Sequence, residues 1–181
     1  NSISISGYHM QEAGADAAKI QLWHADHFPE IERVSKCPLE IPRGRMAEFV
    51  SQGHRCGLQA GASVFDEDAV ALVSLAQCDF IKLAAREQYN QALTDLAFSA
   101  RRVIYRSISE THAFRDADRL TTLFTLQRYP VPMLAALAAI FRAALWFKAH
   151  GVRKWGWSSH TMGILDCVCA ARLGAGVIEK H

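Results

Sequence analysis

Two histidines near the C-terminus stand at the ends of two short apolar runs, and imidazole is a common ligand of divalent metal ions. His160 ends the run that begins at Gly156, and His181 ends the run that begins at Gly174. A helical pattern from Leu165 to Leu173 separates the two runs. If the runs are neighbouring parallel strands, both imidazoles lie at the edge where α/β proteins assemble active sites. The pair predicts a metal or substrate site; the alternative is two half-buried histidines satisfied by hydrogen bonds.

Two lysines, Lys19 and Lys82, each interrupt an otherwise apolar segment earlier in the chain. A lysine within a strand that is buried on both faces costs free energy unless an anion meets its ammonium group. The pair therefore predicts an anion-binding site. The alternative is that each ammonium extends to the rim of the sheet beside a structural glutamate.

The elements that must position these side chains alternate regularly between strand and helix. The expected strands cover residues 18–22, 57–63, 80–84, 103–107, 121–126, 155–158 and 176–179. The expected helices cover residues 42–52, 67–75, 90–100, 132–150 and 164–173. Such repetition predicts a parallel sheet with right-handed crossovers, which makes the fold class α/β and points to a (β/α)8 TIM barrel.

The sequence predicts seven strands, whereas a closed (β/α)8 barrel has eight, and the ends of the chain explain the difference. Residues 10–14 have the pattern of a helix tail before the first expected strand, and the chain stops at His181 directly after the last one. Barrels of this kind usually need about 250 residues. We therefore expect residues 1–181 to form one partial TIM barrel domain, without its first strand and its last helix.

Composition excludes several classes of protein. Lys and Arg number 20 against 18 Asp and Glu, so a net charge of +2 gives no footprint for nucleic acid or an anionic membrane. The five cysteines include no C-x-x-C pair, which argues against disulfides and zinc and favours a cytoplasmic location. The apolar segment 131–151 carries Arg142, Lys148 and His150, so we expect a core-facing helix between Pro132 and Gly151 rather than a membrane span.

Six motifs fall at successive strand ends and together resemble the sialic acid synthase family over nearly the whole chain. They are residues 14–21, 63–66, 80–87, 129–130, 156–161 and 174–181. The family includes N-acetylneuraminate, legionaminic acid and pseudaminic acid synthases and spore coat polysaccharide proteins. One such motif is weak, but six in the same order are specific.

The resemblance implies an enzyme for surface polysaccharide biosynthesis. It condenses phosphoenolpyruvate (PEP) with the open-chain aldehyde of an N-acetylated amino sugar, which releases phosphate and forms a nine-carbon 2-keto acid. A divalent ion, Mn²⁺ or Mg²⁺, assists the reaction. Family members commonly carry a C-terminal antifreeze-like domain, which we do not expect in residues 1–181, and form homodimers.

The resemblance also assigns roles to single residues. The expected metal ligands are His160 and His181, and the expected catalytic residues are Lys19, Lys82 and Glu87, of which the lysines hold PEP. Substrate contacts are expected from Ser63, Gln127, Tyr129 and Ser158. The alternatives are an ordinary charged helix residue for Glu87 and plain strand-end capping for the serines.

Several positions depart from the family pattern. Ala85 and Arg86 stand where Ser-Gly is usual, Arg106 opens a segment that is usually Ser-Thr-Gly, and Ser159 replaces the usual aspartate beside His160. A guanidinium binds phosphate or carboxylate through two hydrogen bonds, so we add Arg106 to the expected substrate-binding residues.

Three functions therefore stay open. The first is the PEP-dependent synthase. The second is a divergent barrel that lacks synthase activity and binds a sugar or an anionic metabolite. The third, a metal-dependent isomerase or lyase that does not use PEP, ranks last because it leaves Lys19 and Lys82 without a shared anion.

Overall fold

Two compact units make up the chain in the computed structural model, which describes residues 9–24, 26, 30, 32, 41–114 and 116–181. The first unit comprises Asn1–Leu83 and Asn90–Ile104, and the second comprises Ala84–Tyr89 and Tyr105–His181. Strand β4 (Val103–Ile108) gives its first two residues to the first unit and the rest to the second. Within the described residues, both units repeat the same order of strand and helix.

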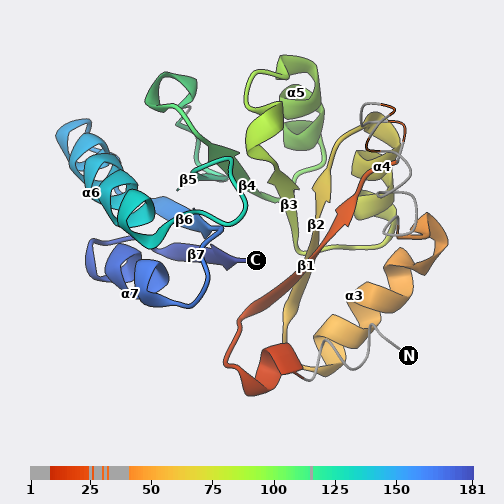
Figure 1. Cartoon of the computed structure of the whole chain (residues 1–181). Helices are drawn as coiled ribbons and strands as arrows, with labels where there is room; N and C mark the ends of the chain where they lie inside the picture. Colours follow the sequence, from red (N-terminus) through yellow and green to blue (C-terminus); the bar gives the residue numbers. More distant parts are fainter. Residues whose placement is uncertain (1–8, 25, 27–29, 31, 33–40, 115) are drawn as a thin grey trace. The chain divides into compact units, whose positions relative to one another are not determined.

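Three parallel strands pair in chain order in the first unit (Figure 1). They are β1 (Ala17–Leu22), β2 (Gln59–Val64) and β3 (Phe80–Leu83). The helices of this unit are α3 (Met46–Arg55), α4 (Glu67–Leu75) and α5 (Gln91–Ser99), and the 3-10 turn η3 (Arg43–Arg45) leads into α3. Both α3 and α4 pack against β2.

Two helices of the first unit, α4 and α5, begin at polar caps. The Asp66 carboxylate accepts a hydrogen bond from the Ala69 backbone N–H at 2.7 Å, and the Asn90 side chain accepts one from the Leu93 N–H at 3.1 Å. Each cap satisfies one of the N–H groups that a helix start leaves without a partner. These caps fix where α4 and α5 leave the ends of the preceding strands.

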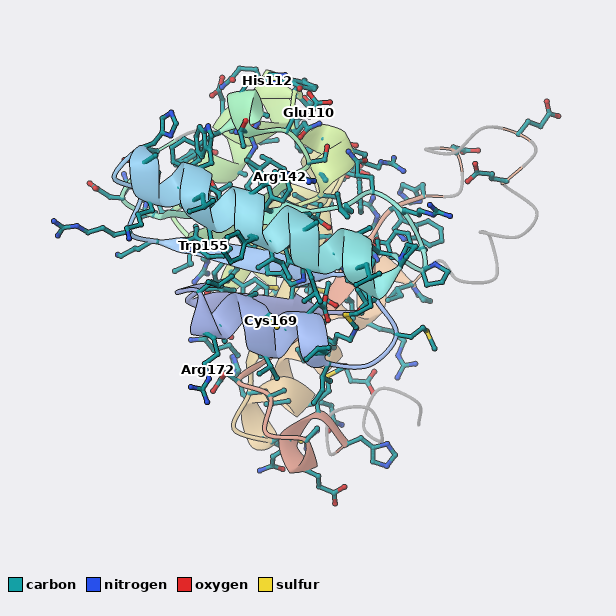
Figure 2. The ribbon with its side chains drawn as sticks, turned by 60° about the vertical axis from the view of Figure 1, so that its left-hand side comes forward. Glu110, His112, Arg142, Trp155, Cys169 and Arg172 are labelled. Atoms are coloured by element: carbon teal, nitrogen blue, oxygen red, sulfur yellow. The ribbon has the colours of Figure 1, made fainter. Side chains whose placement is uncertain are left out.

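Three more parallel strands pair in chain order in the second unit. They are β5 (Leu120–Thr125), β6 (Trp155–Ser159) and β7 (Val177–Lys180). The helices are α6 (Met133–Ala149) and α7 (Leu165–Arg172), with the 3-10 turns η4 (Ala85–Glu87) and η5 (Thr111–Ala113). Figure 2 shows α6 and α7 side by side, and both pack against β6.

Helix α6 supplies five of the nine buried residues of a hydrophobic cluster in the second unit. Its buried residues, Ala136, Ala139, Ile140, Ala143 and Phe147, follow the spacing of one helical face. They pack with two buried tryptophans of β6, Trp155 and Trp157. The helix between Pro132 and Gly151 is therefore confirmed as a core-facing helix, and none of the described helices is long and apolar enough to cross a membrane.

The expected elements are present, with small shifts at their ends. Residues 9–12 are helical before β1, in the region expected to hold a helix tail. The helix expected over 42–52 instead begins as a 3-10 turn and continues to Arg55. Gly57 then turns the chain with φ +71°, which only glycine adopts easily, so β2 starts at Gln59 rather than residue 57. The four described cysteines are free, as expected.

Candidate functional site

The two histidines predicted as metal ligands lie next to each other at the ends of β6 and β7. The strands pair in parallel, with Ser158 opposite Glu179 and Ser159 opposite Lys180. The next residue of each strand is a histidine, so His160 and His181 lie at the same edge of the sheet. The ring centroids of His160 and His181 are 4.5 Å apart, with the ring planes at 80°. The sheet register thus brings together two imidazoles that are 21 positions apart in the sequence.

His160 is held in one tautomer. Its Nδ1 lies 2.8 Å from the Leu126 carbonyl oxygen, which can only accept, so the ring proton sits on Nδ1. The lone pair is then on Nε2, where the Tyr129 hydroxyl donates a hydrogen bond at 2.7 Å. A neutral imidazole with Nδ1–H bound to a carbonyl is the form that binds metals through Nε2.

Tyr129 covers His160 because its loop is attached to the end of β6. The Val131 N–H donates to the His160 carbonyl oxygen at 2.9 Å, and the Tyr129 ring stacks on the imidazole with centroids 3.8 Å apart. Burial raises the pKa of Tyr129 to about 12, and the charge of Glu179 acts in the same direction. The phenol therefore stays protonated at neutral pH and serves as a hydrogen-bond donor.

A carboxylate accompanies the second histidine. Glu179 Oε1 lies 3.8 Å from His181 Nε2, and the Glu179 side chain is only 11% exposed. Within the residues that the structure describes, no group of three or more His, Cys, Asp or Glu side chains is arranged to hold a metal ion. His160 and His181 still fit a divalent ion as two nitrogen ligands, since two ligands leave positions for water and substrate oxygens.

A separate polar network in the second unit includes two more of the predicted residues and lies next to a third. The buried Arg106 donates through Nη2 to the Gln88 carbonyl oxygen, and the Gln88 side chain accepts from the Ser109 N–H at 2.9 Å. Gln127 Nε2 donates to Ser109 Oγ at 2.8 Å. Glu87 is paired with Arg86 at 3.1 Å. Arg106 and Gln127 are thus connected through Gln88 and Ser109, next to the turn that carries Glu87.

This network continues to the surface at the loop after β4. The Tyr89 hydroxyl lies 2.6 Å from both Glu110 Oε2 and His112 Nε2. Figure 2 shows Glu110 and His112 close together on this loop, and all three side chains are exposed. The hydrogen bond to Glu110 raises the pKa of Tyr89, and the negative charge of Glu110 adds to the shift.

The two predicted lysines share one face of the sheet in the first unit. Lys19 pairs in register with Gly61, and Ser63 pairs with Lys82. Since alternate residues of a strand point to the same face, Lys19, Ser63 and Lys82 all lie on one side. Lys19 Nζ donates to Ser63 Oγ at 3.1 Å, and Lys82 is buried, with only 5% of its surface exposed.

The opposite face of these strands explains why the lysines point away from the helices. That face carries small and branched apolar residues, all buried: Ala18, Leu22, Ala60, Ala62, Val64, Ile81 and Leu83. Gly61 has no side chain on the lysine face, and the Phe80 ring occupies the space that a Cβ would take, at 2.5 Å. Register and packing together therefore fix the side on which the two ammonium groups lie.

Sequence reasoning placed its candidates in these three groups and missed residues that support them. Gln88 and Ser109 carry the network around Arg106, and Asp166 lies fully buried at the start of α7. Asp166 gave a usable signal, because it is the only acidic residue in the apolar segment 164–173. A lone carboxylate in such a segment needs hydrogen-bond donors when it is buried.

Comparison with known proteins gives concordant matches. The model of the NeuB family matches residues 8–181. A pseudaminic acid synthase of Helicobacter pylori is 23% identical over 95% of this chain and 58% of its own length. The chain therefore spans a little more than half of that curated relative.

Solved structures match over almost the whole chain. An N-acetylneuraminic acid synthetase from Leptospira borgpetersenii has a TM-score of 0.86 at 20% identity, over 99% of this chain and 66% of its own. A spore coat polysaccharide biosynthesis protein from Bacillus subtilis has a TM-score of 0.79 at 24% identity, over 98% of this chain and 54% of its own. At such identities the likeness establishes the fold, and the incomplete (β/α)8 barrel expected from the sequence is confirmed.

Proposed function

Because the chain belongs to the NeuB family, whose model matches residues 8–181, we propose that it is a sugar-acid synthase that uses PEP. The second substrate is the open-chain aldehyde of an N-acetylated amino sugar, and the product is a nine-carbon 2-keto acid. The observation that carries the proposal is the paired imidazoles of His160 and His181, with the Nε2 lone pair of His160 directed away from the backbone.

The lysine face of the first unit supports the use of an anionic substrate. PEP carries a phosphate and a carboxylate, and Lys19 and Lys82 offer two ammonium groups on one face around Ser63. A charge held in a site with little water interacts more strongly than the same charge in solution. In this proposal, the lysines bind and orient the anionic groups of PEP, and Ser63 holds Lys19 in position.

The histidine pair supports activation of the aldehyde. A divalent ion bound to His160 and His181 would supply Lewis-acid polarisation of the aldehyde oxygen. The chain's own residues prepare this position: the Leu126 carbonyl fixes the tautomer of His160, and the Tyr129 ring covers its face. In this proposal, Tyr129 also offers its hydroxyl to the sugar as a hydrogen-bond donor, because a phenol with a pKa of about 12 is protonated at neutral pH.

The proposed condensation needs no reactant besides PEP, the aldehyde and water. C3 of PEP attacks the aldehyde carbon, which forms the new carbon–carbon bond and leaves a hydroxyl group on the former aldehyde. Water adds at C2, and the bond between C2 and the phosphate oxygen breaks to release phosphate and leave the 2-keto group. Orientation of the two substrates and stabilisation of charge are the protein's main contributions.

The test measures phosphate release from PEP by the purified protein with Mn²⁺ and a panel of N-acetylated amino-sugar aldehydes. We expect release to require PEP, metal and one of the sugars together. Lys82→Met should lower kcat/KM at least about 100-fold, since it removes a charge-assisted contact to the anion. Lys154→Met, which changes an exposed lysine just before β6, is the matched control. Absence of release with every sugar, while Mn²⁺ still binds, would refute the synthase.

A second candidate is a divergent barrel that binds a sugar or anionic metabolite without turnover. It is favoured because arginines stand at positions where the family pattern has hydroxyl-bearing or small residues. Both arginines make contacts within the protein: Arg106 donates to the Gln88 carbonyl oxygen, and Arg86 is paired with Glu87. This candidate predicts that PEP binds and that phosphate is never released. The same assay, combined with a binding measurement for PEP, separates the two functions.

A further inference from the structure

The two faces of β6 and β7 carry different kinds of side chain near the histidine pair. Alternate residues point to opposite faces, so Ser158 and Glu179 share one face, while Trp157, Ser159 and Lys180 share the other. Glu179 lies near His181 on the first face. The second face is the one that packs against helices, where Trp157 joins the buried core. A set of polar groups lies on this helix side, directly behind the histidine pair.

Lys180 connects the ends of the two strands from behind. Its Nζ donates to Ser159 Oγ at 2.9 Å and to the Thr161 carbonyl oxygen at 2.6 Å. Ser159 and Thr161 flank His160 in the chain, and Lys180 directly precedes His181. One ammonium group therefore holds a side chain before His160 and the backbone after it, and it belongs to the residue next to His181.

Asp166 fixes the same segment from α7. Its carboxylate accepts from Thr161 Oγ1 and from Trp157 Nε1, each at 2.8 Å, and its side chain is fully buried. Burial alone would raise the pKa of Asp166, but the hydrogen bonds from Trp157, Ser159 and Thr161 lower it below the usual value. A charged carboxylate in the first turn of a helix is also stabilised by the helix dipole.

We propose that Lys180 and Asp166 are positioning residues that set the separation and orientation of His160 and His181. They act by holding Ser159 and Thr161, between which His160 lies, against the strand that ends in His181. The inference rests on the proposed function in one respect, that the two imidazoles bind the metal. Groups that orient metal ligands from behind typically contribute about 10- to 100-fold to metal affinity.

The first test uses Mn²⁺ alone, titrated into the protein and followed by calorimetry. Lys180→Met keeps the length of the side chain and removes its three donors, and we expect the Mn²⁺ dissociation constant to rise at least about tenfold. Lys180→Arg should restore most of the affinity, because a guanidinium can donate to both Ser159 Oγ and the Thr161 carbonyl. Lys154→Met is again the control and should bind as the unchanged protein does. Equal affinities of Lys180→Met and Lys154→Met would overturn the proposal.

The second test needs no metal and separates the inference from the proposed function. The ¹⁵N and ¹H signals of the His160 and His181 imidazoles report ring environment and tautomer by NMR. We expect both sets to shift or broaden in Lys180→Met and in Asp166→Asn, and to stay in place in Lys154→Met. Unshifted imidazole signals in a folded Lys180→Met protein would refute the positioning role. If the imidazole signals shift but neither the unchanged protein nor any variant binds Mn²⁺, the metal part of the proposed function fails and the positioning role stands.

Discussion

The hydrogen bond between Tyr129 and His160 uses the same lone pair that a metal ion would use. The Tyr129 hydroxyl donates to His160 Nε2 at 2.7 Å, while Nδ1 is committed to the Leu126 carbonyl. The Tyr129 hydroxyl would therefore have to leave Nε2 before a divalent ion could be held there. Tyr129 then has a donor available for a substrate oxygen, so its two proposed roles follow one another.

Tyr129→Phe tests this exchange. Removal of the hydroxyl eliminates a competitor worth about 0.5–1.5 kcal/mol, so Mn²⁺ should bind about 2- to 10-fold more tightly. The same change should raise KM for the amino sugar, because a donor is lost. Mn²⁺ calorimetry and steady-state kinetics measure the two effects. Weaker Mn²⁺ binding in the variant would mean that the phenol is itself a ligand, which contradicts this account.

Asp166 gives a prediction for stability in acid. Its folded-state pKa lies below the usual value, so its contribution to the free energy of unfolding is present above about pH 4 and is lost as the pH falls through the folded pKa. Asp166→Asn leaves at least one of the donors from Trp157 and Thr161 without an acceptor and should cost about 2 kcal/mol at pH 7.

Thermal unfolding of the two proteins at pH 7 and at about pH 3 checks this prediction. The difference between the unchanged protein and Asp166→Asn should shrink at the lower pH, since the unfolded chain binds a proton there that the folded chain resists. A difference that is the same at both pH values would show that the charge of Asp166 does not stabilise the fold.

Residue types identified the candidate site residues, but they did not identify the contacts that hold those residues in place. The histidines and lysines could be found in the sequence because each interrupts or ends an apolar run. The roles of Lys180 and Asp166 could not, because their partners Ser159 and Thr161 are reached only across the sheet and from α7. Ser159 looked like a lost aspartate; in the fold, it accepts from Lys180 and donates to Asp166.

At the scale of elements, the close packing of β5, β6 and β7 depends on one glycine. A Cβ at Gly156 would lie 2.5 Å from the Val177 carbonyl oxygen and 2.9 Å from Leu123 Cγ. The first of these contacts is with backbone, which cannot move aside without shifting β7. Gly156 therefore sets how closely the strands that carry the two histidines approach.

Gly156→Ala should lower the free energy of unfolding by about 2–3 kcal/mol, as overpacking of a core typically does. It should also weaken Mn²⁺ binding, since β7 must shift relative to β6. Gly44→Ala is the control, because a Cβ there meets nothing within 4 Å. Urea unfolding curves compare the two; similar midpoints would contradict the packing argument.

Element order could be predicted from the sequence because the strands are nearly continuous apolar runs separated by helical periodicity. The bounds that shifted are at α3 and β2, where a single glycine decides the outcome. The apolar neighbours of Gly57 suggest that it belongs to β2. Its positive φ instead places it in the turn that follows α3. Sequence pattern alone does not distinguish these two uses of glycine.

At the scale of the whole molecule, binding of PEP should stabilise the fold through mass action. At a PEP concentration of about 100 times Kd, the gain is about 2.7 kcal/mol, which raises the Tm of a chain of this size by roughly 5–10 °C. Differential scanning fluorimetry with and without PEP measures it. The rise should be lost in Lys82→Met and kept in Lys154→Met; a Tm that PEP leaves unchanged would argue for a reaction without PEP.

The family and the fold could be predicted from six short motifs in the right order, and both are confirmed. The substrate could not, because the arrangement of Gln127, an expected substrate contact, and of its partner Ser109 is set by loops rather than by strand pattern. The chain covers 58% of the pseudaminic acid synthase it matches, so the activity of the whole protein remains our proposal.

Anomalous X-ray diffraction from crystals grown with Mn²⁺ and PEP would show directly whether the two histidines hold a metal ion. We expect an anomalous peak within bonding distance of Nε2 of both His160 and His181, with the Tyr129 hydroxyl displaced from His160. We also expect density for PEP on the face that carries Lys19 and Lys82. Bound Mn²⁺ at another position, with the Tyr129 hydroxyl still on His160 Nε2, would contradict this prediction.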